Sequence, residues 1–558
     1  MDALGWDSAD IILISGDSYI DTPYSGVALL GKWLMSNGFQ TAIIAQPDVR
    51  NLQDISRLGE PNLFWGVSSG CVDSMVANYT ALLKKRKTDD FTPGGLNNRR
   101  PDRAVLVYTN LIRNYSNQIH PKQTGKPVML GGIEASLRRI AHYDYWSDKI
   151  RRSILLDAKA DYLIYGMAEK SILEFARKLK HGEDPKNIKG LTYLSKQEPE
   201  GFIKLPPFED AATDKTAFIQ MFKTFYENND AINGIGLTQR YKNRFLVQNP
   251  PSTPLTQSEL DSLYSLDYEY AQHPYYERIG KVKALETIKF SIPTHRGCYG
   301  ECNFCAISVH EGRTVQWRSE ASILSEIKVL ASKPDFKGYI HDLGGPTANM
   351  YGFECVKKSK TGSCKNKQCL LPEPCPALLV DHSKLIDVMT RSRKLEGIKK
   401  VFVASGIRYD LIHSDKKHGN GYMLELFTHH VSGQLKIAPE HSESKILKLM
   451  GKPGVNQLLD FKAKFDETAR KLGKKQYLTY YFIAAHPGCT EQDMIKLKRF
   501  SSTKLKMSPD QVQVFTPTPS TYSSLMYFTE INPFSGEKIF VEKDLKRKKR
   551  QKDILVGN

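Results

Sequence analysis

The sequence has no long hydrophobic run. Nowhere do its 558 residues approach the roughly 18 consecutive apolar positions that a transmembrane helix needs, which excludes a membrane span. The first segment, MDALGWDSADII, is acidic and lacks the basic residues that precede the apolar part of a secretory signal, so no signal peptide is apparent. We therefore expect a cytoplasmic protein that has no membrane partner.

Cysteine is also scarce, and nine cysteines in a chain of this length do not form a disulfide framework. Seven of the nine fall between residues 298 and 375, and this clustering favours metal binding in a reducing compartment. Apolar residues make up 40% and charged residues 25%, values that are ordinary for a globular protein with ample chain to bury a core.

Acidic residues are too few to balance the basic ones, and the formal net charge is +18. An excess of this size favours a polyanionic partner, and RNA is the first candidate. The alternative is a solvated surface with a frayed basic tail over residues 542–558, because no aromatic residues are interleaved with the charges. The basic runs are Lys84, Lys85, Arg86 and Lys87; Arg99, Arg100 and Arg103; and Lys546, Arg547, Lys548, Lys549 and Arg550.

Three cysteines, Cys298, Cys302 and Cys305, occur within eight residues in the spacing C-x3-C-x2-C. One tight loop can bring three thiolates to a single metal centre, one short of the four that fully ligate a cubane iron–sulfur cluster. Such a cluster keeps one iron open to bind and activate a substrate. The alternatives are a zinc site completed by His295 or His310, or three unrelated buried thiols.

The loop SIPTHRGCYGECNFCAI resembles the signature of the radical S-adenosylmethionine (SAM) superfamily, with an aromatic residue, Phe304, before the last cysteine. Together with HDLGGPTANMYG, KIAPEHSE and FTPTPSTYSSLMY, it makes the chain resemble the YgiQ family of bacterial radical SAM proteins. The resemblance extends over nearly the whole chain, from SGDSYIDTPYSG to the end. It implies a cofactor and does not imply a particular reaction.

The resemblance implies that Cys298, Cys302 and Cys305 hold a [4Fe-4S] cluster whose fourth iron is chelated by SAM, with Phe304 close to the adenine. An electron donor of the flavodoxin or ferredoxin type would reduce the cluster. Cleavage of SAM would then yield a 5′-deoxyadenosyl radical that takes a hydrogen atom from an unidentified substrate. The domain order resembles that of methylthiolating and methylating enzymes, so we expect an enzyme that carries out a transferase-type modification.

Two further segments follow expected strands where the superfamily contacts SAM. Gly344 and Gly345 lie in a turn that would present backbone carbonyls to the SAM amino group, and a simple strand-to-loop turn is the alternative. The stretch HPGC holds a Pro-Gly turn that could touch the adenine, while its Cys489 is expected to be an unligated thiol.

Ser405 and Arg408 stand where the family contacts the SAM ribose or carboxylate. A guanidinium group pairs well with a carboxylate, so the alternative for Arg408 is a salt bridge to Asp410 or another acid. Glu440 and His441 follow a later expected strand, and they either contact the ligand or cap the helix after it.

Residues 1–200 predict a parallel sheet covered by helices on both sides, a Rossmann-like domain of the shape that binds cobalamin in many radical SAM proteins. Helical patterns such as GVALLGKWLMSNG, which ends at Gly38, separate several short apolar runs. The expected strands are Asp10–Ser15, Thr41–Ala45, Leu63–Val67, Ala104–Tyr108, Pro127–Leu130 and Tyr162–Tyr165.

Sheets of this kind bind ligands at the carboxyl ends of their strands, where the loop GDSYIDTPYSG and the segment Gly131–Glu134 lie. Cobalamin domains usually carry a D-x-H-x-x-G loop whose histidine ligates cobalt. The loop after Gly16 has no histidine at that place, which argues against cobalamin and leaves base-off binding without a cobalt-ligating histidine as the alternative. Asp17 and Asp21 either contact a substrate or serve as turn and cap residues.

Residues 201–283 mix aromatic, polar and proline residues and predict a helical connector that packs on both neighbours. Residues 284–541 alternate six apolar runs with helical segments, which predicts a partial (β/α)6 barrel related to the TIM barrel, with the cysteine loop directly after its first strand. The expected strands are Lys289–Ile292, Tyr339–His341, Val401–Ala404, Gln434–Ile437, Tyr477–Ile483 and Val512–Phe515.

A second group of cysteines, Cys355, Cys364, Cys369 and Cys375, falls in an insertion at residues 353–376. The insertion is rich in lysine and poor in apolar residues, so it cannot build a core, and four thiolates around one zinc ion would fold it. A second iron–sulfur cluster and a disulfide-bonded or redox-active loop are the alternatives. Cys71 in the first domain is expected to be a buried packing residue.

Two functions follow from these features. The first is a radical SAM enzyme whose substrate the sequence does not reveal. Methylthiolation of tRNA is one version of it, weakened by the lack of a C-terminal RNA-binding barrel after the core. The second is an RNA- or ribosome-associated binding protein in which the metal has a sensing or structural role. Glycine turns at successive strand ends favour the enzyme, since a binding protein does not need them.

Overall fold

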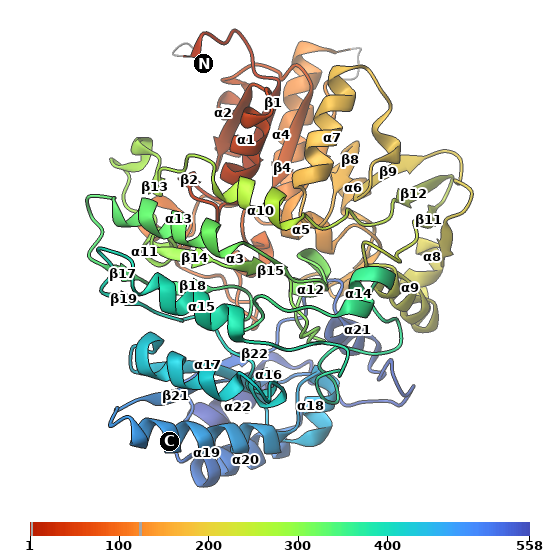
Figure 1. Ribbon diagram of the computed structural model, residues 1–558. Coiled ribbons are helices and arrows are strands. Elements are labelled where there is room, and N and C mark those ends of the chain that lie inside the picture. Colours follow the sequence, from red (N-terminus) through yellow and green to blue (C-terminus); the bar gives the residue numbers. More distant parts are fainter. Residues whose placement is uncertain (2–3, 122–124, 558) are drawn as a thin grey trace. The chain divides into compact units, whose positions relative to one another are not determined.

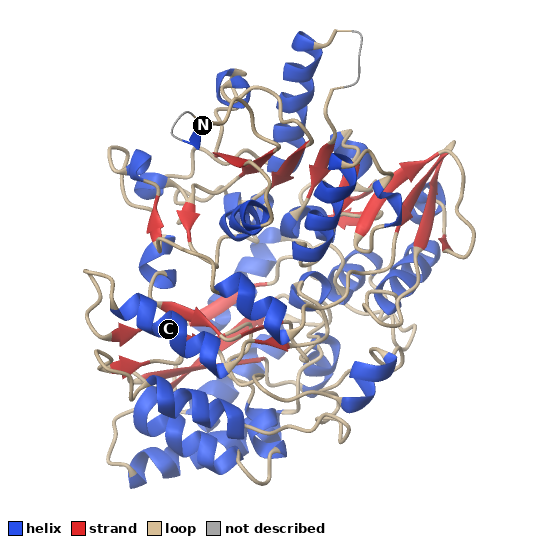
Figure 2. Ribbon diagram, turned by 45° about the horizontal axis from the view of Figure 1, so that its top comes forward, coloured by secondary structure: helices blue, strands red, loops and turns tan. Residues whose placement is uncertain are grey.

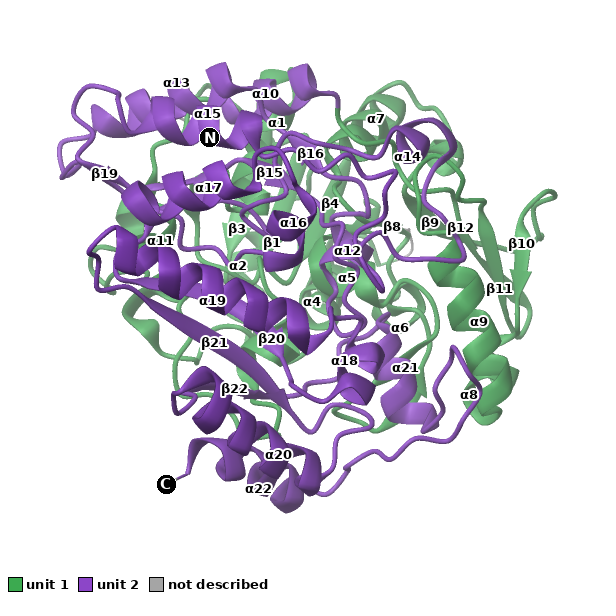
Figure 3. Ribbon diagram, turned by 60° about the horizontal axis from the view of Figure 1, so that its bottom comes forward, with its two compact units in different colours: residues 1–255, 266–289 green, residues 256–265, 290–558 purple. Residues whose placement is uncertain are grey.

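The computed structural model describes residues 1, 4–121 and 125–557, and it divides into two compact units (Figure 3). Unit 1 comprises Met1–Leu255 and Leu266–Lys289, and unit 2 comprises Thr256–Ser265 and Phe290–Asn558. Both mix helices and strands (Figure 2). Among the described residues, every helix is too short or too polar to span a lipid bilayer.

Unit 1 is built on a sheet of nine strands (Figure 1). Five of them, in the order β3-β1-β4-β5-β8, are parallel, and β9, β12 and β11 continue the sheet in antiparallel fashion to the edge strand β10. The strands are β1 Ile11–Ser15, β3 Thr41–Ala45, β4 Phe64–Ser68, β5 Val128–Leu130, β8 Tyr162–Ile164, β9 Leu191–Ser195, β10 Ile203–Leu205, β11 Leu237–Tyr241 and β12 Arg244–Gln248.

Helices cover both faces of the parallel part, as its continuous apolar strands predict. Ile11 and Leu13 of β1 pack in one core with residues of α1 and α7, whereas Trp65 of β4 meets Tyr115 of α4 edge to face at 6.4 Å. The helices of unit 1 are α1 Gly26–Ser36, α2 Gln53–Ser56, α3 Ser74–Asn78, α4 Ala104–Ile119, α5 Gly132–Leu137, α6 Ile154–Ala158, α7 Glu169–Lys180, α8 Phe208–Thr213, α9 Lys215–Glu227 and α11 Ala284–Ile288.

The strand predicted at Ala104–Tyr108 is wrong, because these residues form the first turns of α4. The run AVLVY is short and wholly apolar, and such a run does not distinguish a strand from a buried helix. The burial pattern identifies the helix, since Val105, Tyr108 and Ile112 are buried at helical spacing. The other five predicted strands of this domain are confirmed to within a few residues.

The segment expected to be a helical connector, residues 201–283, also contains strands. β10, β11 and β12 extend the sheet of unit 1, and helices α8 and α9 lie between the first two of them. The short helix α10, Gln257–Tyr264, belongs to unit 2. The segments LTQRY and RFLVQ show only a weak alternation of apolar and polar residues, which was not recognised within the aromatic and polar composition of the whole segment.

Unit 2 contains six parallel strand runs that pair in chain order. β14 pairs with β18, β17 with β19, and β20 with β21 and β21 with β22, while a single parallel bridge joins Ile407 after β19 to Ile437 of β20. The six runs are β14 Ser291–Pro293, β17 Tyr339–Ile340 together with β18 Asp342–Gly344, β19 Lys400–Val401, β20 Gln434–Glu440, β21 Tyr477–Ala484 and β22 Gln511–Val514. All six runs expected from the sequence are found.

Helices follow these strands in turn, and three two-stranded ribbons complete the molecule. The helices are α12 Ile307–His310, α13 Glu320–Ala331, α14 Val356–Thr361, α15 Ser383–Ser392, α16 Tyr409–Ser414, α17 Gly419–Glu425, α18 Ser444–Met450, α19 Val455–Lys471, α20 Glu491–Phe500, α21 Tyr522–Thr529 and α22 Leu545–Val556. The ribbons pair β2 Ile20–Asp21 with β13 Ala271–Gln272, β6 His142–Asp144 with β7 Lys149–Arg151, and β15 His295–Arg296 with β16 Gln316–Trp317.

The basic C-terminal segment is not frayed. Its helix α22 buries Lys548, Gln551 and Leu555. Lys548 Nζ lies 2.7 Å from the hydroxyl oxygen of Tyr527, and the amide of Gln551 bonds the backbone at Ala485 and Cys489. Three positions at helical spacing therefore dock this helix, and part of the positive charge in the run is internal.

Candidate functional site

The three closely spaced cysteines lie in the loop between β15 and α12, just after the first strand of unit 2. The sulfurs of Cys298 and Cys302 both lie near Gly300, where a Cβ would stand 3.2 Å from the first and 3.7 Å from the second. The Gly300 N–H points at the Cys298 sulfur at 3.3 Å, and the Cys305 N–H bonds the carbonyl of Cys302 at 2.9 Å. The loop is thus wound tightly around its thiols.

The side chains of these cysteines are partly accessible, but the thiols lie deep. Burial first, and then the neighbouring Cys302, raise the pKa of the Cys298 and Cys305 thiols. As the side chains stand, no three of the His, Cys, Asp or Glu residues within the described ranges form a group that could hold a metal ion. Three soft thiol donors on one short loop are nevertheless the donor set of an iron–sulfur cluster, so the residues fit such a group chemically.

Of the two histidines that could complete a zinc site, His295 is already engaged. Its Nδ1 lies 2.8 Å from the Thr294 hydroxyl, and its Nε2 lies 3.1 Å from the carbonyl of Thr347. Its ring also packs against Gly345, where a Cβ would come within 2.6 Å of it. Gly345 therefore admits an imidazole to the strand end, a role that the sequence did not suggest.

Gly344 and Ser405 lie together at the ends of neighbouring strands. A Cβ on Gly344 would come within 2.7 Å of the Ser405 hydroxyl, and that hydroxyl donates to the carboxylate of Asp342. Asp342 also accepts the backbone N–H groups of Ala404 and Ser405, at 2.8 and 3.0 Å. One carboxylate thus fixes the turn after β19 to the first residue of β18.

Arg408 reaches the cysteine loop. Its Nη1 lies 3.7 Å from the Cys302 sulfur, while its Nε and Nη2 bond the two carboxylate oxygens of Asp410 at 2.8 and 2.5 Å. Both side chains are buried, at 6% and 1% exposure. The expected alternative, a salt bridge to Asp410, is therefore present, and one N–H edge of the guanidinium still faces a cysteine.

Besides the pair Arg408–Asp410, the site contains a second buried ion pair, Lys452–Glu440. Lys452 Nζ is 3.7 Å from the Glu440 carboxylate, and both residues are less than a tenth exposed. Burial raises the pKa of Glu440 against the opposing effect of Lys452 and Arg408. Burial also opposes ionisation of Asp410, but Arg408 and then Lys452 outweigh it, so the pKa of Asp410 is lowered.

Glu440 itself is in the left-handed region, with φ of +68°, at the carboxyl end of β20. Ala485, at the end of the neighbouring β21, has φ of +58°. Non-glycine residues rarely adopt this conformation, and they persist in it only where the surrounding structure enforces it, most often at functional sites. The ends of two adjacent parallel strands of unit 2 therefore share this signature.

The remaining expected SAM contact is Phe304, whose ring meets His486 edge to face at 6.3 Å. His486 Nδ1 bonds the carbonyl of Pro487, so its Nε2 accepts the hydroxyl proton of Ser523 at 2.7 Å. Ser523 in turn donates its N–H to the carbonyl of Asn303, beside Cys302. Residues that sequence reasoning missed thus brace the cysteine loop, and no local pattern marks them.

The second cysteine group is gathered in part. Cys355 lies in a buried cluster with Tyr299 and Leu370, against which Cys298, Cys369 and Cys375 also pack. Lysines face two of these sulfurs, with Lys367 Nζ 3.5 Å from Cys375 and Lys358 Nζ 3.8 Å from Cys369. Cys364 contributes its carbonyl to Arg313. All nine cysteines are free thiols in the described residues, so the disulfide alternative for this loop is not found.

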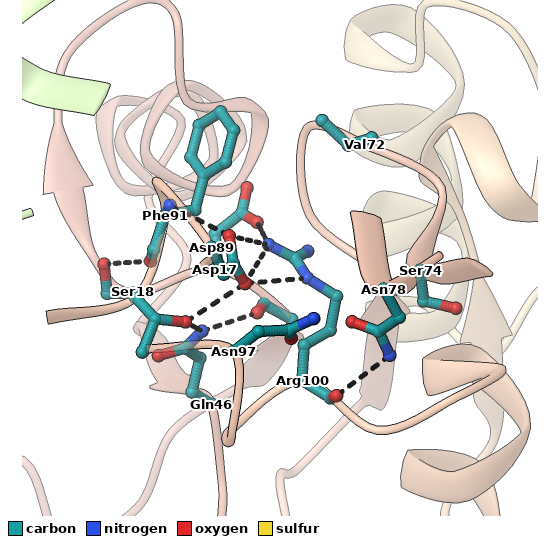
Figure 4. A network of polar contacts seen from close by, with 12 residues as sticks. Asp17, Ser18, Gln46, Val72, Ser74, Asn78, Asp89, Phe91, Asn97 and Arg100 are labelled. Carbon is teal, nitrogen blue, oxygen red and sulfur yellow. Dashed lines mark hydrogen bonds and ion pairs between the residues drawn. The ribbon is translucent and has the colours of Figure 1, made fainter. Parts of the chain in front are cut away.

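In unit 1, the strand order places a topological switch point between β1 and β4, where sheets of this kind bind ligands. Figure 4 shows the Arg100 guanidinium between Asp17 and Asp89 at this place. Arg100 Nη2 lies 2.7 Å from Asp17 and 3.1 Å from Asp89, and all three side chains are buried. Arg100 was expected in a surface run, and Asp17 was a candidate substrate contact.

The crevice itself is closed. A Cβ on Gly16 would collide with the carbonyl oxygen of Ser69, and one on Gly70 would collide with the Asp17 carboxylate. Arg100 Nη1 bonds the Ser69 carbonyl at 2.5 Å. Asp21 pairs with Lys32 at 3.1 Å and is structural as well. Buried side chains of unit 1 thus occupy the space between the ends of β1 and β4.

Known proteins resemble this chain over its full length. Residues 1–291 match the family described as Radical SAM N-terminal. A UPF0313 protein of Fusobacterium nucleatum is 56% identical over 556 residues, covering 100% of this chain and 97% of its own. A UPF0313 protein of Thermotoga maritima is 47% identical over 559 residues, with the same coverage of 100% and 97%.

Solved structures of radical SAM enzymes are more distant. The methyltransferase TsrM from Kitasatospora setae, with cobalamin and a [4Fe-4S] cluster bound, superposes with a TM-score of 0.49 at 14% identity, covering 93% of this chain and 78% of that one. The cobalamin-dependent enzyme OxsB, with aqua-cobalamin bound, gives 0.49 at 12% identity, over 94% and 56%. The expected relationship to radical SAM proteins of the YgiQ type is confirmed by the full-length relatives.

Proposed function

This chain belongs to the UPF0313 family of radical SAM proteins, and from that premise we propose that it is an enzyme that cleaves SAM reductively and starts radical chemistry on its substrate. The observation that carries the proposal is the loop in which the Cys298 and Cys302 sulfurs converge on Gly300, at the end of the first parallel strand. We propose a transferase-type modification as the outcome, and a cytoplasmic location.

In this proposal Cys298, Cys302 and Cys305 hold a [4Fe-4S] cluster. Bound there, the cluster supplies an electron, received from a flavodoxin- or ferredoxin-like donor, and an open iron for SAM. The chain's residues orient SAM and exclude water around it, with Phe304 against the adenine. The strand-end residues Gly344, Gly345, Ser405, Arg408 and Glu440 form the rest of its surroundings, within a unit that we assign to the partial (β/α)6 barrel.

The test is the cleavage of SAM by wild-type protein. Oxygen-free protein reduced with dithionite is expected to convert SAM to 5′-deoxyadenosine and methionine in the absence of substrate, because the radical then takes hydrogen from solvent or protein. Liquid chromatography with mass detection measures both products. Protein with a full complement of iron and sulfide that produces neither of them would overturn the proposal.

We propose that cobalamin is not a cofactor of unit 1. Support comes from the closed crevice between β1 and β4, where Arg100, Asp17 and the backbone of Ser69 take the space. The residues present therefore do not fit a corrinoid at this switch point. A corrinoid absorbance spectrum in protein incubated with cobalamin and desalted would contradict this.

We propose a metal at the second cysteine group. Three of its four thiols pack on one cluster, and Lys367 faces Cys375, whose pKa is lowered first by backbone N–H donors and then by that lysine. A thiol that ionises readily favours metal binding. Cys369→Ser is expected to remove one metal, zinc or the iron of a second cluster, whereas Cys71→Ser should remove none. Metal analysis by mass spectrometry that finds equal contents in both variants would refute the proposal.

A further inference from the structure

The insertion at residues 353–376, which carries the second cysteine group, is bound directly to the cysteine loop, and both belong to unit 2. The half-buried Gln368 makes two of the contacts. Its Nε2 carries two protons and donates to the backbone carbonyl of Glu301 at 2.9 Å and to Oδ1 of Asn303 at 3.1 Å. Glu301 precedes Cys302 in the chain and Asn303 follows it. One side chain of the insertion therefore holds the residues on both sides of a proposed cluster ligand.

Glu301 has a strained backbone that its surroundings must maintain. Its φ of +44° lies in the left-handed region, which a residue with a side chain keeps only where neighbouring groups enforce it. Arg313 pairs with its carboxylate, and both side chains are buried. Arg313 Nη2 also donates to the carbonyl of Cys364, within the insertion, at 3.3 Å. The insertion thus contacts the carbonyl of the strained residue directly and its carboxylate by way of Arg313.

Two more contacts join the insertion to this part of unit 2. The Tyr299 hydroxyl donates to the carbonyl of Phe353 at 3.0 Å, at the start of the insertion. Lys358 donates to the backbone carbonyl of Arg313, and its Nζ lies 3.8 Å from the Cys369 sulfur. Every residue with a polar side chain between the three cysteines of the loop is therefore in contact with the insertion, directly or through a neighbour.

Asn303 is held from the opposite side as well. Its backbone N–H donates to the carbonyl of Met450 at 2.9 Å, and its Nδ2 donates to that of Leu449 at 3.0 Å. Its donors are thus engaged by the end of α18, and its Oδ1 accepts from Gln368. Because Asn303 is only 3% exposed, the loss of the Gln368 donor is expected to leave this acceptor poorly satisfied.

We propose that Gln368 is a positioning residue that couples the two cysteine groups, an inference that rests on the proposed function. A metal at the second group fixes Cys369, and Gln368, the residue before it, is thereby fixed against both neighbours of Cys302. The cysteine loop is then held in the shape that ligates its cluster. Since a coupling between two binding equilibria is reciprocal, metal at either group favours metal at the other.

The first test is the rate at which full-length, oxygen-free protein loses its cluster to excess EDTA. The signal followed is the electron paramagnetic resonance signal that changes when SAM is added, which separates this cluster from any iron at the second group. Gln368→Met keeps the side-chain length and removes both donated hydrogen bonds. It is expected to lose the signal about tenfold faster, since two hydrogen bonds between neutral groups together have about this effect.

The g-values of Gln368→Met are also expected to differ from those of the wild type, whereas a residue that only stabilises the fold would leave them unchanged. Asn366→Met, at an exposed position of the same insertion, is the matched control and should behave as the wild type does. Gln368→Asn keeps the amide on a shorter side chain and replaces Gln368→Met if that variant does not fold. Folded variants of Gln368 with the wild-type rate and g-values would overturn the inference.

The second test is a double-mutant cycle that measures the coupling. Cys369→Ser is expected to speed the loss of the SAM-responsive signal, because it frees Gln368. Combining it with Gln368→Met should have less effect than the product of the two single effects, since both changes act through one contact. Effects that multiply would show two independent groups and overturn the coupling. Wild-type protein without a SAM-responsive signal would instead contradict the proposed function, and this inference with it.

Discussion

Alanine at Cys302 is expected to remove the cluster and all reductive cleavage of SAM. The reason is the number of ligands, because three thiolates are already one short of a full set, and two do not retain a cubane through purification. Arg408 Nη1 also lies 3.7 Å from the Cys302 sulfur. Loss of Cys302 therefore removes a ligand and leaves a buried cation without its sulfur partner.

Iron and sulfide content, broad visible absorbance and 5′-deoxyadenosine formation are measured together on oxygen-free protein. Cys71→Ala is the matched control. Cys71 follows β4 in unit 1, so this variant is expected to leave all three measurements unchanged. A Cys302→Ala protein that still forms 5′-deoxyadenosine would show that the cluster is held elsewhere.

Arg408→Gln is expected to make the reduction potential of the cluster more negative without preventing its assembly. Reduction adds negative charge, and a guanidinium 3.7 Å from the Cys302 sulfur, a proposed cluster ligand, would stabilise the reduced form. Asp410→Asn should act in the opposite direction, because it leaves the cation and removes the carboxylate that balances it. A Coulomb estimate at about 5 Å and an effective dielectric constant of about 20 sets the upper limit on the order of 100 mV, with compensation by neighbours reducing it.

The potentials are measured by redox titration monitored by electron paramagnetic resonance, on protein without SAM. Omitting SAM separates the two roles open to Arg408, since a residue that only binds SAM would change SAM affinity and leave the SAM-free potential alone. Shifts of the same sign in both variants, or none in either, would contradict the electrostatic role of the pair.

The cysteine loop could be predicted from the sequence because its three thiols lie close together in the chain. Cys298, Cys302 and Cys305 are close in the chain, so their spacing alone restricts the geometry. The network around Arg408 was visible only in part, since Asp410 is two residues away but Lys452 comes from the turn after α18. Long-range partners of this kind leave no local pattern.

Burial of charge was the least predictable property. Arg100 and Lys548 stand in basic runs whose composition predicts a solvated surface. Arg100 is instead buried between the carboxylates of Asp17 and Asp89, and Lys548 is buried against the Tyr527 hydroxyl. This removes part of the charge argument for an RNA partner, while the run Lys84–Lys87 and four of the five basic residues in the run 546–550 stay exposed. The start of helix α4 was predicted as a strand for a different reason, because a five-residue apolar run is too short to show a helical or a strand period.

A [4Fe-4S] cluster held by three cysteines would leave one iron open for SAM to bind. The most direct test is the electron paramagnetic resonance spectrum of the reduced protein before and after SAM is added. We expect a cubane signal whose g-values change on addition of SAM and stay unchanged on addition of 5′-methylthioadenosine, which lacks the amino-acid amino and carboxylate groups that would chelate the iron. A signal indifferent to SAM, or protein that contains stoichiometric zinc and no sulfide at these cysteines, would contradict it.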